Sequence, residues 1–197
     1  MKVTFVVGPG RWAQLRSAVP GGPRSEWRPY SIRHRTSAPQ LPRLVLVCAM
    51  RVALGADDST RVVDAIANFL TAAGHVVARY GKAAAEDEAW ASTGERVAKA
   101  VAAGEHDFGI VCCWTGTGVS IAANKVPGIR AALCVDAETA RGARKWNDAN
   151  VLALSLRLTS EEVAKEIVGA WLAEPYGGTE DESLAVLSAL DGRKLGS

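Results

Sequence analysis

The sequence predicts an α/β fold, a three-layer sandwich in which helices cover both faces of a five-stranded parallel sheet. Short apolar segments of five or six residues recur along the chain, and amphipathic segments of helical length separate them. Consecutive strands that are joined by helices pair in parallel, and a parallel sheet must be covered on both faces. A glycine-rich turn, WTGTG at 114–118, directly follows one of these apolar segments, as in sheets that bind a ligand at their edge.

Each element has its own signal in the sequence. The first strand is RVALGA (51–56), and the helix expected over 59–75 has Ser59 or Thr60 as N-cap, an apolar face and Gly74 as terminator. The other strands are expected at 76–80, 108–113, 130–135 and 151–156, and the other helices near 92–103, from 119, and over 137–147, 160–173 and 182–190. In such Rossmann-like or flavodoxin-like sheets, ligands bind beyond the carboxyl ends of the strands, near a switch in strand order.

Charge and composition divide the chain at Met50. Residues 1–49 contain eight Lys or Arg and one Glu, and they hold six of the eight prolines, whereas 50–197 contain 15 basic and 20 acidic residues. We expect 1–49 to be a poorly structured basic arm, with an early assigned start, a targeting segment or a short strand at 44–48 as alternatives. We expect 50–197 to form the functional domain, and its acidic balance argues against a nucleic-acid partner.

The number and spacing of the cysteines, and the absence of a long apolar run, indicate the cellular compartment. Four cysteines, at 48, 112, 113 and 134, show no spacing typical of metal ligands. No apolar run approaches the roughly 20 residues of a membrane span, so no membrane partner is expected. A reducing, cytoplasmic location is therefore the expectation.

The WTGTG turn predicts an anion-binding loop, because its glycines let successive backbone N–H groups converge. A tight connection between strand and helix is the alternative. The turn has neither the Lys of a P-loop nor the spacing of a dinucleotide fingerprint.

A longer string is far more specific. TGTGVSIAANKVPGIRAALC (115–134), followed by ETARGARKWNDANVLALSLR (138–157), resembles the family of type B ribose-5-phosphate isomerases and galactose-6-phosphate isomerases, as do RVALGADD (51–58) and GHVV (74–77). The resemblance implies an aldose–ketose isomerase that converts a small sugar phosphate, of the ribose 5-phosphate and ribulose 5-phosphate type, through an enediolate. It also implies carbohydrate metabolism of the pentose phosphate kind, no metal or organic cofactor, and a homodimer whose active site borrows residues from the partner.

The resemblance assigns roles to individual residues. Cys113 is the expected base, and a strand end that faces a helix N-terminus favours its thiolate; a small buried hydrophobe is the alternative. Cys112 is expected to face the opposite side and lie in the core, and Val119 occupies a position where other members have a glutamate base. Thr115 is expected to act on the reacting oxygens. Further substrate contacts are implied for Asp57, Trp114, Gly116, Thr117, Gly118, Asn147 and, on the phosphate, Arg157.

The chain departs from the family at three places. Asp58 stands where the family has a histidine, Trp146 replaces the ring-opening histidine, and the acidic stretch 177–183 replaces a basic cluster. We count Asp58 and Trp146 among the substrate contacts, with a core or dimer-interface aromatic as the alternative for Trp146. Arg144 or Lys145 could supply the missing positive charge. His34, His75 and His106 are expected to be exposed and outside the site.

These departures keep three alternatives open. The first is an isomerase of an unphosphorylated or differently charged sugar, the second a non-catalytic sugar-binding member of the family, and the third a nucleotide-binding domain.

Overall fold

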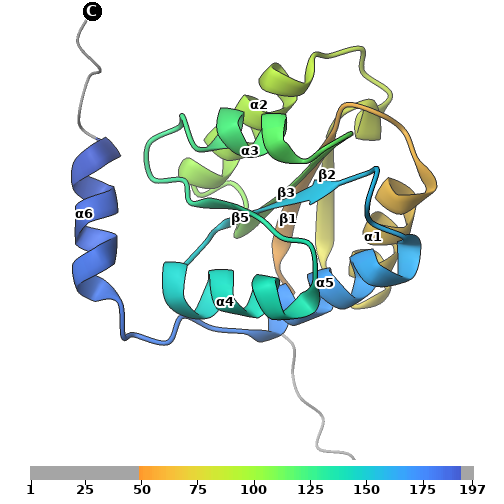
Figure 1. The fold of residues 1–197 in the computed structure, drawn as a ribbon. Helices are drawn as coiled ribbons and strands as arrows, with labels where there is room; N and C mark the ends of the chain where they lie inside the picture. Colours follow the sequence, from red (N-terminus) through yellow and green to blue (C-terminus); the bar gives the residue numbers. More distant parts are fainter. Residues whose placement is uncertain (1–48, 192–197) are drawn as a thin grey trace, which may run out of the picture. The chain divides into compact units, whose positions relative to one another are not determined.

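The computed structural model describes residues 49–191, in which strands and helices alternate along the chain (Figure 1). The strands are β1 (Arg51–Ala56), β2 (Val76–Gly81), β3 (Phe108–Cys113), β4 (Ala131–Leu133) and β5 (Val151–Ser155). The helices are α1 (Arg61–Ala72), α2 (Trp90–Ala102), α3 (Thr117–Ala123), α4 (Ala137–Asn147), α5 (Glu161–Ala173) and α6 (Asp181–Asp191), with a short 3₁₀ turn, η1 (Lys82–Ala84). The predicted α/β class is confirmed. The expectations for residues 1–48 lie outside the described residues.

The five strands form one parallel sheet in the order β2-β1-β3-β5-β4. The chain moves from β1 to β2 on one side and then returns to place β3 on the other side of β1. The strand order therefore reverses between β1 and β3. In open parallel sheets, a ligand site forms at the carboxyl ends of the strands that flank such a reversal.

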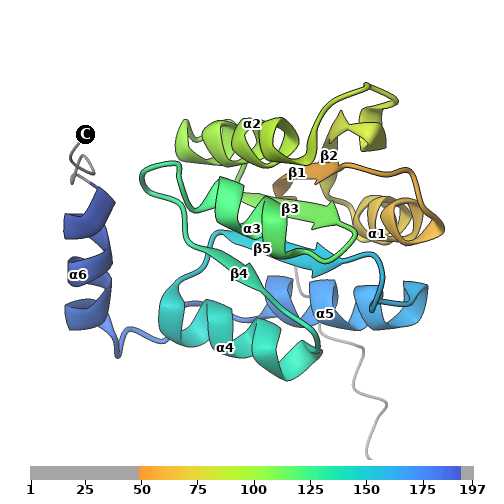
Figure 2. The same cartoon turned by 45° about the horizontal axis from the view of Figure 1, so that its top comes forward.

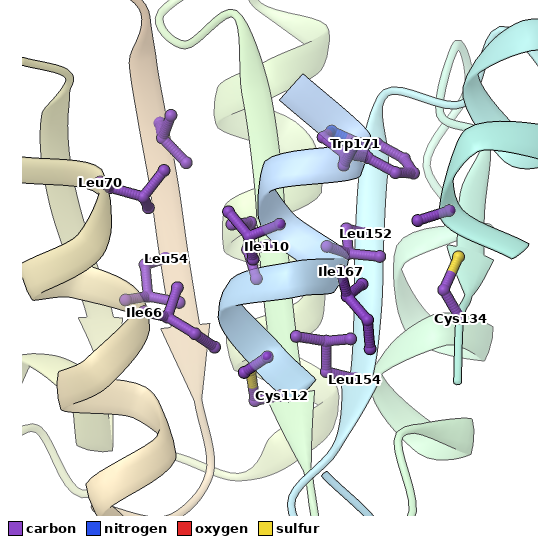
Figure 3. Close-up of a cluster of buried hydrophobic side chains, with 14 of the residues drawn as sticks. Leu54, Ile66, Leu70, Ile110, Cys112, Cys134, Leu152, Leu154, Ile167 and Trp171 are labelled. Carbon is purple, nitrogen blue, oxygen red and sulfur yellow. The ribbon is translucent and has the colours of Figure 1, made fainter. Parts of the chain in front are cut away.

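Alternating residues of the strands pack into two separate hydrophobic cores, one on each face of the sheet. On one face, α1, α4 and α5 cover side chains such as Leu54, Ile110 and Leu152, with Trp171 fully buried at one end of this core (Figures 2 and 3). On the other face, α2 and α3 cover Val111 and Ala153. The central strands β3 and β5 are continuous apolar runs because both of their faces are buried.

The Asn124 side chain covers the outer edge of the sheet at β4. It accepts a hydrogen bond from Ala131 N (2.9 Å) and donates one to Ala131 O (2.8 Å), in the manner of a neighbouring strand. Capping an edge in this way discourages pairing with another chain. On the inner side, the Asn150 side chain, just before β5, accepts from Arg130 N and donates to Gly128 O, which holds the segment before β4 against β5.

The ends of several elements differ from expectation; α1 ends at Ala72 and β4 spans only Ala131–Leu133. Thr60 is the N-cap of α1, as predicted, but its side chain makes no capping hydrogen bond and its hydroxyl is buried without a partner. Helix α3 begins at Thr117, inside the glycine loop, two residues earlier than expected, because Gly116 takes the left-handed conformation that starts it. No helix within residues 49–191 combines the length and the apolar character that crossing a membrane requires.

Candidate active site

Three loops meet at the carboxyl edge of the sheet, at the reversal between β1 and β3. Asp57 N donates to Cys112 O (3.3 Å), which ties the loop after β1 to the end of β3. Arg157 N donates to Trp114 O (3.0 Å), and the Ser155 hydroxyl donates to the same carbonyl (3.0 Å), which ties the loop after β5 to the glycine loop. The backbone therefore holds the predicted residues Asp57, Trp114 and Arg157 on neighbouring strand ends.

Cys113 is the last residue of β3 and lies at the base of the glycine loop. Gly116 N donates to Cys113 Sγ (3.2 Å) and to Cys113 O (3.1 Å), so the loop closes over the sulfur. The side chain packs with the α2–α3 core and is 5% exposed. A thiol that accepts an N–H bond at a strand end can act as a proton acceptor for a molecule in the loop.

Cys112 lies on the opposite face of β3, as expected. It is fully buried in the core beneath α1 and α5 (Figure 3). Burial, with smaller contributions from Cys113 and Asp57, raises the pKa of the Cys112 thiol to about 12. It therefore stays protonated at physiological pH and belongs to the packing.

The glycine loop presents hydroxyl groups beside the sulfur. Thr115 and Thr117 are exposed, and their Oγ1 atoms are hydrogen-bonded at 2.7 Å. Trp114 is 63% exposed next to them, and Thr117 and Gly118 form the first turn of α3. The expected donors of this loop thus occur together on one short segment, free to contact a ligand.

Val119 is fully buried under the loop. A carboxylate at this position would face the α2–α3 core, so Val119 leaves Cys113 as the candidate base on this segment.

Asp57 is the partly buried carboxyl group at this edge. Its Oδ1 atom is buried and has no hydrogen-bond partner. Burial raises the pKa of Asp57; its own backbone N–H acts the other way, and the Asp58 carboxylate adds to the increase. Asp58 itself is exposed.

Arg157 provides the positive charge expected at this edge. It is exposed and makes no salt bridge with any of the described residues. Its guanidinium is therefore available to an anionic group in solution.

Trp146 and Asn147 do not join this edge within one chain. They end α4, which runs antiparallel to the strands, and so they lie at the amino edge of the sheet, just before β5. A strand of six residues spans about 20 Å. One chain thus carries two separate groups of predicted site residues.

Trp146 lines a cavity of about 690 Å³ between β4, α4 and α6, together with Asn147, Leu133, Leu187 and Leu190. Its ring lies back along α4 against Gly142, where a Cβ would meet the ring at 2.8 Å. The ring is nevertheless 51% exposed. Because Trp146 lies at the amino edge, far from Cys113 of the same chain, its exposed ring fits the interface alternative better than a sugar contact within the same chain.

The acidic stretch follows the same edge. Gly177 N donates to Lys145 O (2.8 Å), which holds the segment beside the end of α4. The Tyr176 hydroxyl then bonds Asp181 (2.7 Å) and accepts from Glu180 N (3.0 Å). The negative charges therefore lie near Trp146 and Asn147, and not near the Cys113 loop of the same chain.

Arg144 does not supply the missing positive charge, contrary to one expectation. It is 9% exposed, lies over Phe108 and Trp171 (4.5 and 5.6 Å to the ring centroids), and donates to Ala149 O. Two aromatic rings and a carbonyl account for its burial, so only Lys145 of the two remains accessible.

The two described histidines lie at the amino side of the sheet, away from Cys113, as expected, but the expected exposure is wrong. His75 is 6% exposed and its Nδ1 accepts from Met50 N (3.2 Å). His106 is partly buried and bonded to the Tyr80 hydroxyl (2.9 Å). His75 thus satisfies a backbone N–H just before β1, and His106 satisfies a side-chain hydroxyl of β2. Within residues 49–191, no group of three or more His, Cys, Asp or Glu is arranged to hold a metal ion.

Trp90 borders the site, although no motif in the sequence marks it as a site residue. It is 46% exposed, and a Cβ on Gly118 would lie 3.0 Å from its Cε3 atom. An apolar aromatic at the start of a helix, after an acidic loop, was the only available signal.

Comparison with known proteins supports one family. The family model described as Ribose/Galactose Isomerase matches residues 52–186. Ribose-5-phosphate isomerase B of Escherichia coli (strain K12) is 47% identical over 100 residues, which are 50% of this chain and 67% of that protein. D-erythrulose-4-phosphate isomerase of Pectobacterium atrosepticum is 40% identical over 131 residues, 66% of this chain and 86% of that protein.

A solved structure supports the same relationship. Ribose-5-phosphate isomerase B of Clostridium thermocellum superposes with a TM-score of 0.68 at 39% identity, covering 72% of this chain and 97% of that one. The chain therefore belongs to the ribose/galactose isomerase family and is a sugar-phosphate aldose–ketose isomerase.

Proposed function

We propose that this protein interconverts an aldose phosphate and its ketose phosphate, of the ribose 5-phosphate and ribulose 5-phosphate type, through an enediolate, with Cys113 as the base. The observation that carries the proposal is the Cys113 sulfur, held by Gly116 N at the strand-order reversal and beside the Thr115 and Thr117 hydroxyls. The reaction is proposed to need no metal and no organic cofactor.

In this mechanism, the Cys113 thiolate removes the proton on C2 of the aldose. Backbone N–H groups of 114–118 and the Thr115 hydroxyl donate to the oxygen on which negative charge develops. The proton then returns from Cys113 to C1, which yields the ketose. Arg157, exposed and without an ion-pair partner among the described residues, binds the phosphate.

The functional unit is proposed to be a homodimer with a shared active site. Asp57, Cys113 and Arg157 lie at the carboxyl edge, whereas Trp146 and Asn147 lie at the amino edge about 20 Å away. A second copy that places its amino edge over the carboxyl edge of the first would unite the two groups. Without that contact, Asn147 would have no route to a substrate bound at Cys113.

A four-carbon sugar phosphate is a second candidate substrate, and two observations favour it. One relative is a D-erythrulose-4-phosphate isomerase, of which this chain covers 86%. Neither edge group contains a histidine among the described residues. An aldotetrose 4-phosphate cannot close a furanose ring, because its O4 carries the phosphate, so its isomerisation requires no ring-opening acid.

The remaining part of the proposal concerns location. The cysteines at 112, 113 and 134 are buried and free. Free thiols of this kind fit a reducing compartment, and we place the protein in the cytoplasm.

A coupled isomerase assay tests the function. The purified protein is given tetrose, pentose and hexose phosphates beside the corresponding free sugars, and ketose formation is followed at equal substrate concentrations. We expect turnover of at least one sugar phosphate and much slower turnover of its free sugar. Turnover of free sugars alone would contradict the proposed substrate class, and binding without any turnover would favour the non-catalytic alternative.

A further inference from the structure

The end of α4 carries Asn147, a proposed substrate contact, at the amino edge of the sheet. Its side chain is exposed and makes no hydrogen bond with any of the described residues. The direction of this amide therefore depends on how firmly the backbone at the end of the helix is held.

Asp148 reverses the chain directly after Asn147. It has a φ of +44°, in the left-handed region, where a residue other than glycine is uncommon. Ala149 N donates back to Ala143 O (3.0 Å), which closes the helix, and β5 begins at Val151. Glycine would adopt this backbone conformation without strain, so the carboxylate of Asp148 has to be explained by its contacts.

Arg130, just before β4, binds both the backbone and the side chain of Asp148. Its Nε donates to Asp148 O (2.7 Å), and its Nη2 donates to Asp148 Oδ2 (2.7 Å). Arg130 is itself fixed, because its N–H donates to Asn150 Oδ1 (2.8 Å) and its carbonyl accepts from Asn150 N (3.1 Å). The N–H groups of a guanidinium form a rigid, planar fork, so two bonds at once fix the orientation of the residue that accepts them.

Arg144, on α4, holds the same turn from the inside of the protein. Its Nη1 donates to Ala149 O (2.6 Å) and lies 3.6 Å from Asp148 Oδ1. The guanidinium is buried against Phe108 and Trp171, 4.5 and 5.6 Å from their ring centroids. A buried charge is costly unless it is paired and hydrogen-bonded, and both polar partners of this arginine lie in the turn after α4.

The held turn lies directly beside the exposed amide. Asn147 stands between Arg144 and Asp148 in the chain, so the contacts that fix these two residues also fix the backbone of Asn147. A side chain whose backbone is fixed in advance loses less conformational entropy when it binds a ligand.

We propose, on the basis of the proposed function, that Arg130 and Arg144 are positioning residues of the isomerase. By holding Asp148 in its left-handed conformation, they keep the Asn147 amide in the direction in which it reaches a substrate in the glycine loop of the partner subunit. Neither arginine touches the substrate, and their effect on the reaction passes through Asn147.

A double-mutant cycle separates positioning from stability. Arg130→Lys keeps the positive charge, but one ammonium group cannot reproduce the two forked bonds to Asp148. We expect this change to lower kcat/KM by about tenfold in the wild-type background. Asn147→Ala should itself lose at least about tenfold, and adding Arg130→Lys to it should cost less than about twofold more, because the residue to be positioned is gone. A purely structural role would give equal losses in both backgrounds.

Asp148 provides a second test that does not strain the fold. Asp148→Gly adopts the left-handed conformation freely but has no carboxylate, so the protein should stay folded and lose kcat/KM by about tenfold. Asp148→Asn keeps an oxygen that can accept from Arg130 and tolerates the left-handed region, so it should stay within about threefold of the wild type.

Arg79→Lys is the matched control. Arg79 lies on β2, the strand at the opposite edge of the sheet, and its Nη1 donates to Asp64 Oδ1 (3.1 Å). The variant makes the same change in an Arg–Asp pair that is far from α4. It should leave kcat/KM unchanged in both backgrounds.

The outcomes separate the two proposals. If wild type and Arg79→Lys turn over no sugar phosphate, the proposed function fails, and this inference fails with it. If they are active, the positioning role alone is overturned by any of three results: Asn147→Ala within about twofold of the wild type, Arg130→Lys without effect, or Arg130→Lys with equal losses in both backgrounds. Thermal unfolding and sedimentation velocity identify any Arg130 variant that has lost its fold or its oligomeric state, and Asp148→Gly, combined with Asn147→Ala in the same cycle, then decides.

Discussion

Gly116 shows how one residue shapes the candidate site. It has a φ of +75°, and its N–H contacts the Cys113 sulfur. A Cβ there would lie 2.5 Å from Leu133 Cδ1 and 2.9 Å from the Leu154 carbonyl carbon. Only glycine therefore satisfies both the backbone conformation and the space, so the loop can close over the sulfur.

We accordingly expect Gly116→Ala to lower the free energy of unfolding by about 2–4 kcal/mol, from left-handed strain and overpacking together. Gly104→Ala is the matched control, because Gly104 has a similar φ of +73° but nothing within 4 Å of its Cβ position. Its cost should be about 1–2 kcal/mol. Urea unfolding measures both losses. An equal loss of free energy of unfolding in the two variants would show that the packing around Gly116 is not tight.

Cys112 supplies a prediction of pH dependence. The folded state raises the pKa of its thiol from 9.0 to about 12, so the thiol ionises first in the unfolded chain. Stability from this group is complete below about pH 9 and is lost as pH rises toward 12, at about 1.4 kcal/mol per pH unit. Burial raises the pKa of Cys134 to about 12 as well, in the same direction.

Urea unfolding between pH 7.5 and 10.5 measures this effect. Cys112→Ala should be less stable than wild type at pH 7.5 because of lost packing, but its stability should fall less steeply with pH. An identical slope in wild type and variant would contradict the assigned burial of the thiol.

At the scale of elements, hydrophobic patterning predicted the strands and helices well, because both faces of the sheet are covered and the central strands β1, β3 and β5 are nearly continuous apolar runs. Local contacts that depend on distant partners were not predictable. The burial of His75, for example, follows from its bond to Met50, 25 residues away. Trp90 likewise became part of the site only through the packing of α2 on α3 against Gly118.

The acidic segment between α5 and α6 is the element that most affects which substrate charge the site accepts. Tyr176 and the Gly177–Lys145 contact hold Glu180 and Asp181 at the amino edge, which in the proposed dimer faces the partner's Arg157 loop. Each close, unscreened carboxylate opposes a phosphate by about 1 kcal/mol or more at intermediate dielectric. The wild-type protein should therefore show a KM for ribose 5-phosphate above about 1 mM.

Replacing two of these charges should improve the reaction. Glu180→His combined with Glu182→Arg should raise kcat/KM for ribose 5-phosphate by about tenfold, more at low salt than at high salt. Glu161→His combined with Glu166→Arg makes the same change on α5 and should have no comparable effect. Efficient turnover by the wild type, unchanged by the first pair, would show that the acidic segment does not approach the phosphate.

At the scale of the whole molecule, the family resemblance anticipated a site completed by a second copy, and the topology gives this expectation a physical basis. Asp57, Thr115 and Arg157 each follow an apolar segment that was predicted as a strand, and in the fold each lies within two residues of a strand's carboxyl end. The placement of Trp146 and Asn147 at the opposite edge could be read only from the direction of α4 relative to the strands.

We expect residues 1–49 to be dispensable, because the family model matches only 52–186. A chain that starts at Met50 should fold and retain activity. A chain that starts at Val52 is the informative comparison, because it loses the Arg51–Asp107 ion pair (2.8 Å) and the Met50–His75 hydrogen bond, and it should unfold at lower temperature. Insolubility or inactivity of the Met50 chain would contradict this assignment.

The turnover number of Cys113→Ser, measured on the sugar phosphate that the wild type converts fastest, tests the central claim most directly. A hydroxyl is a far weaker base than a thiolate, so kcat should fall by at least about 10²-fold with unchanged circular dichroism. Cys112→Ser, one residue away in the opposite core, should reduce stability but leave most of the turnover. A Cys113→Ser protein that retains wild-type turnover, or an exchange of effects between the two variants, would contradict the assignment of Cys113 as the base.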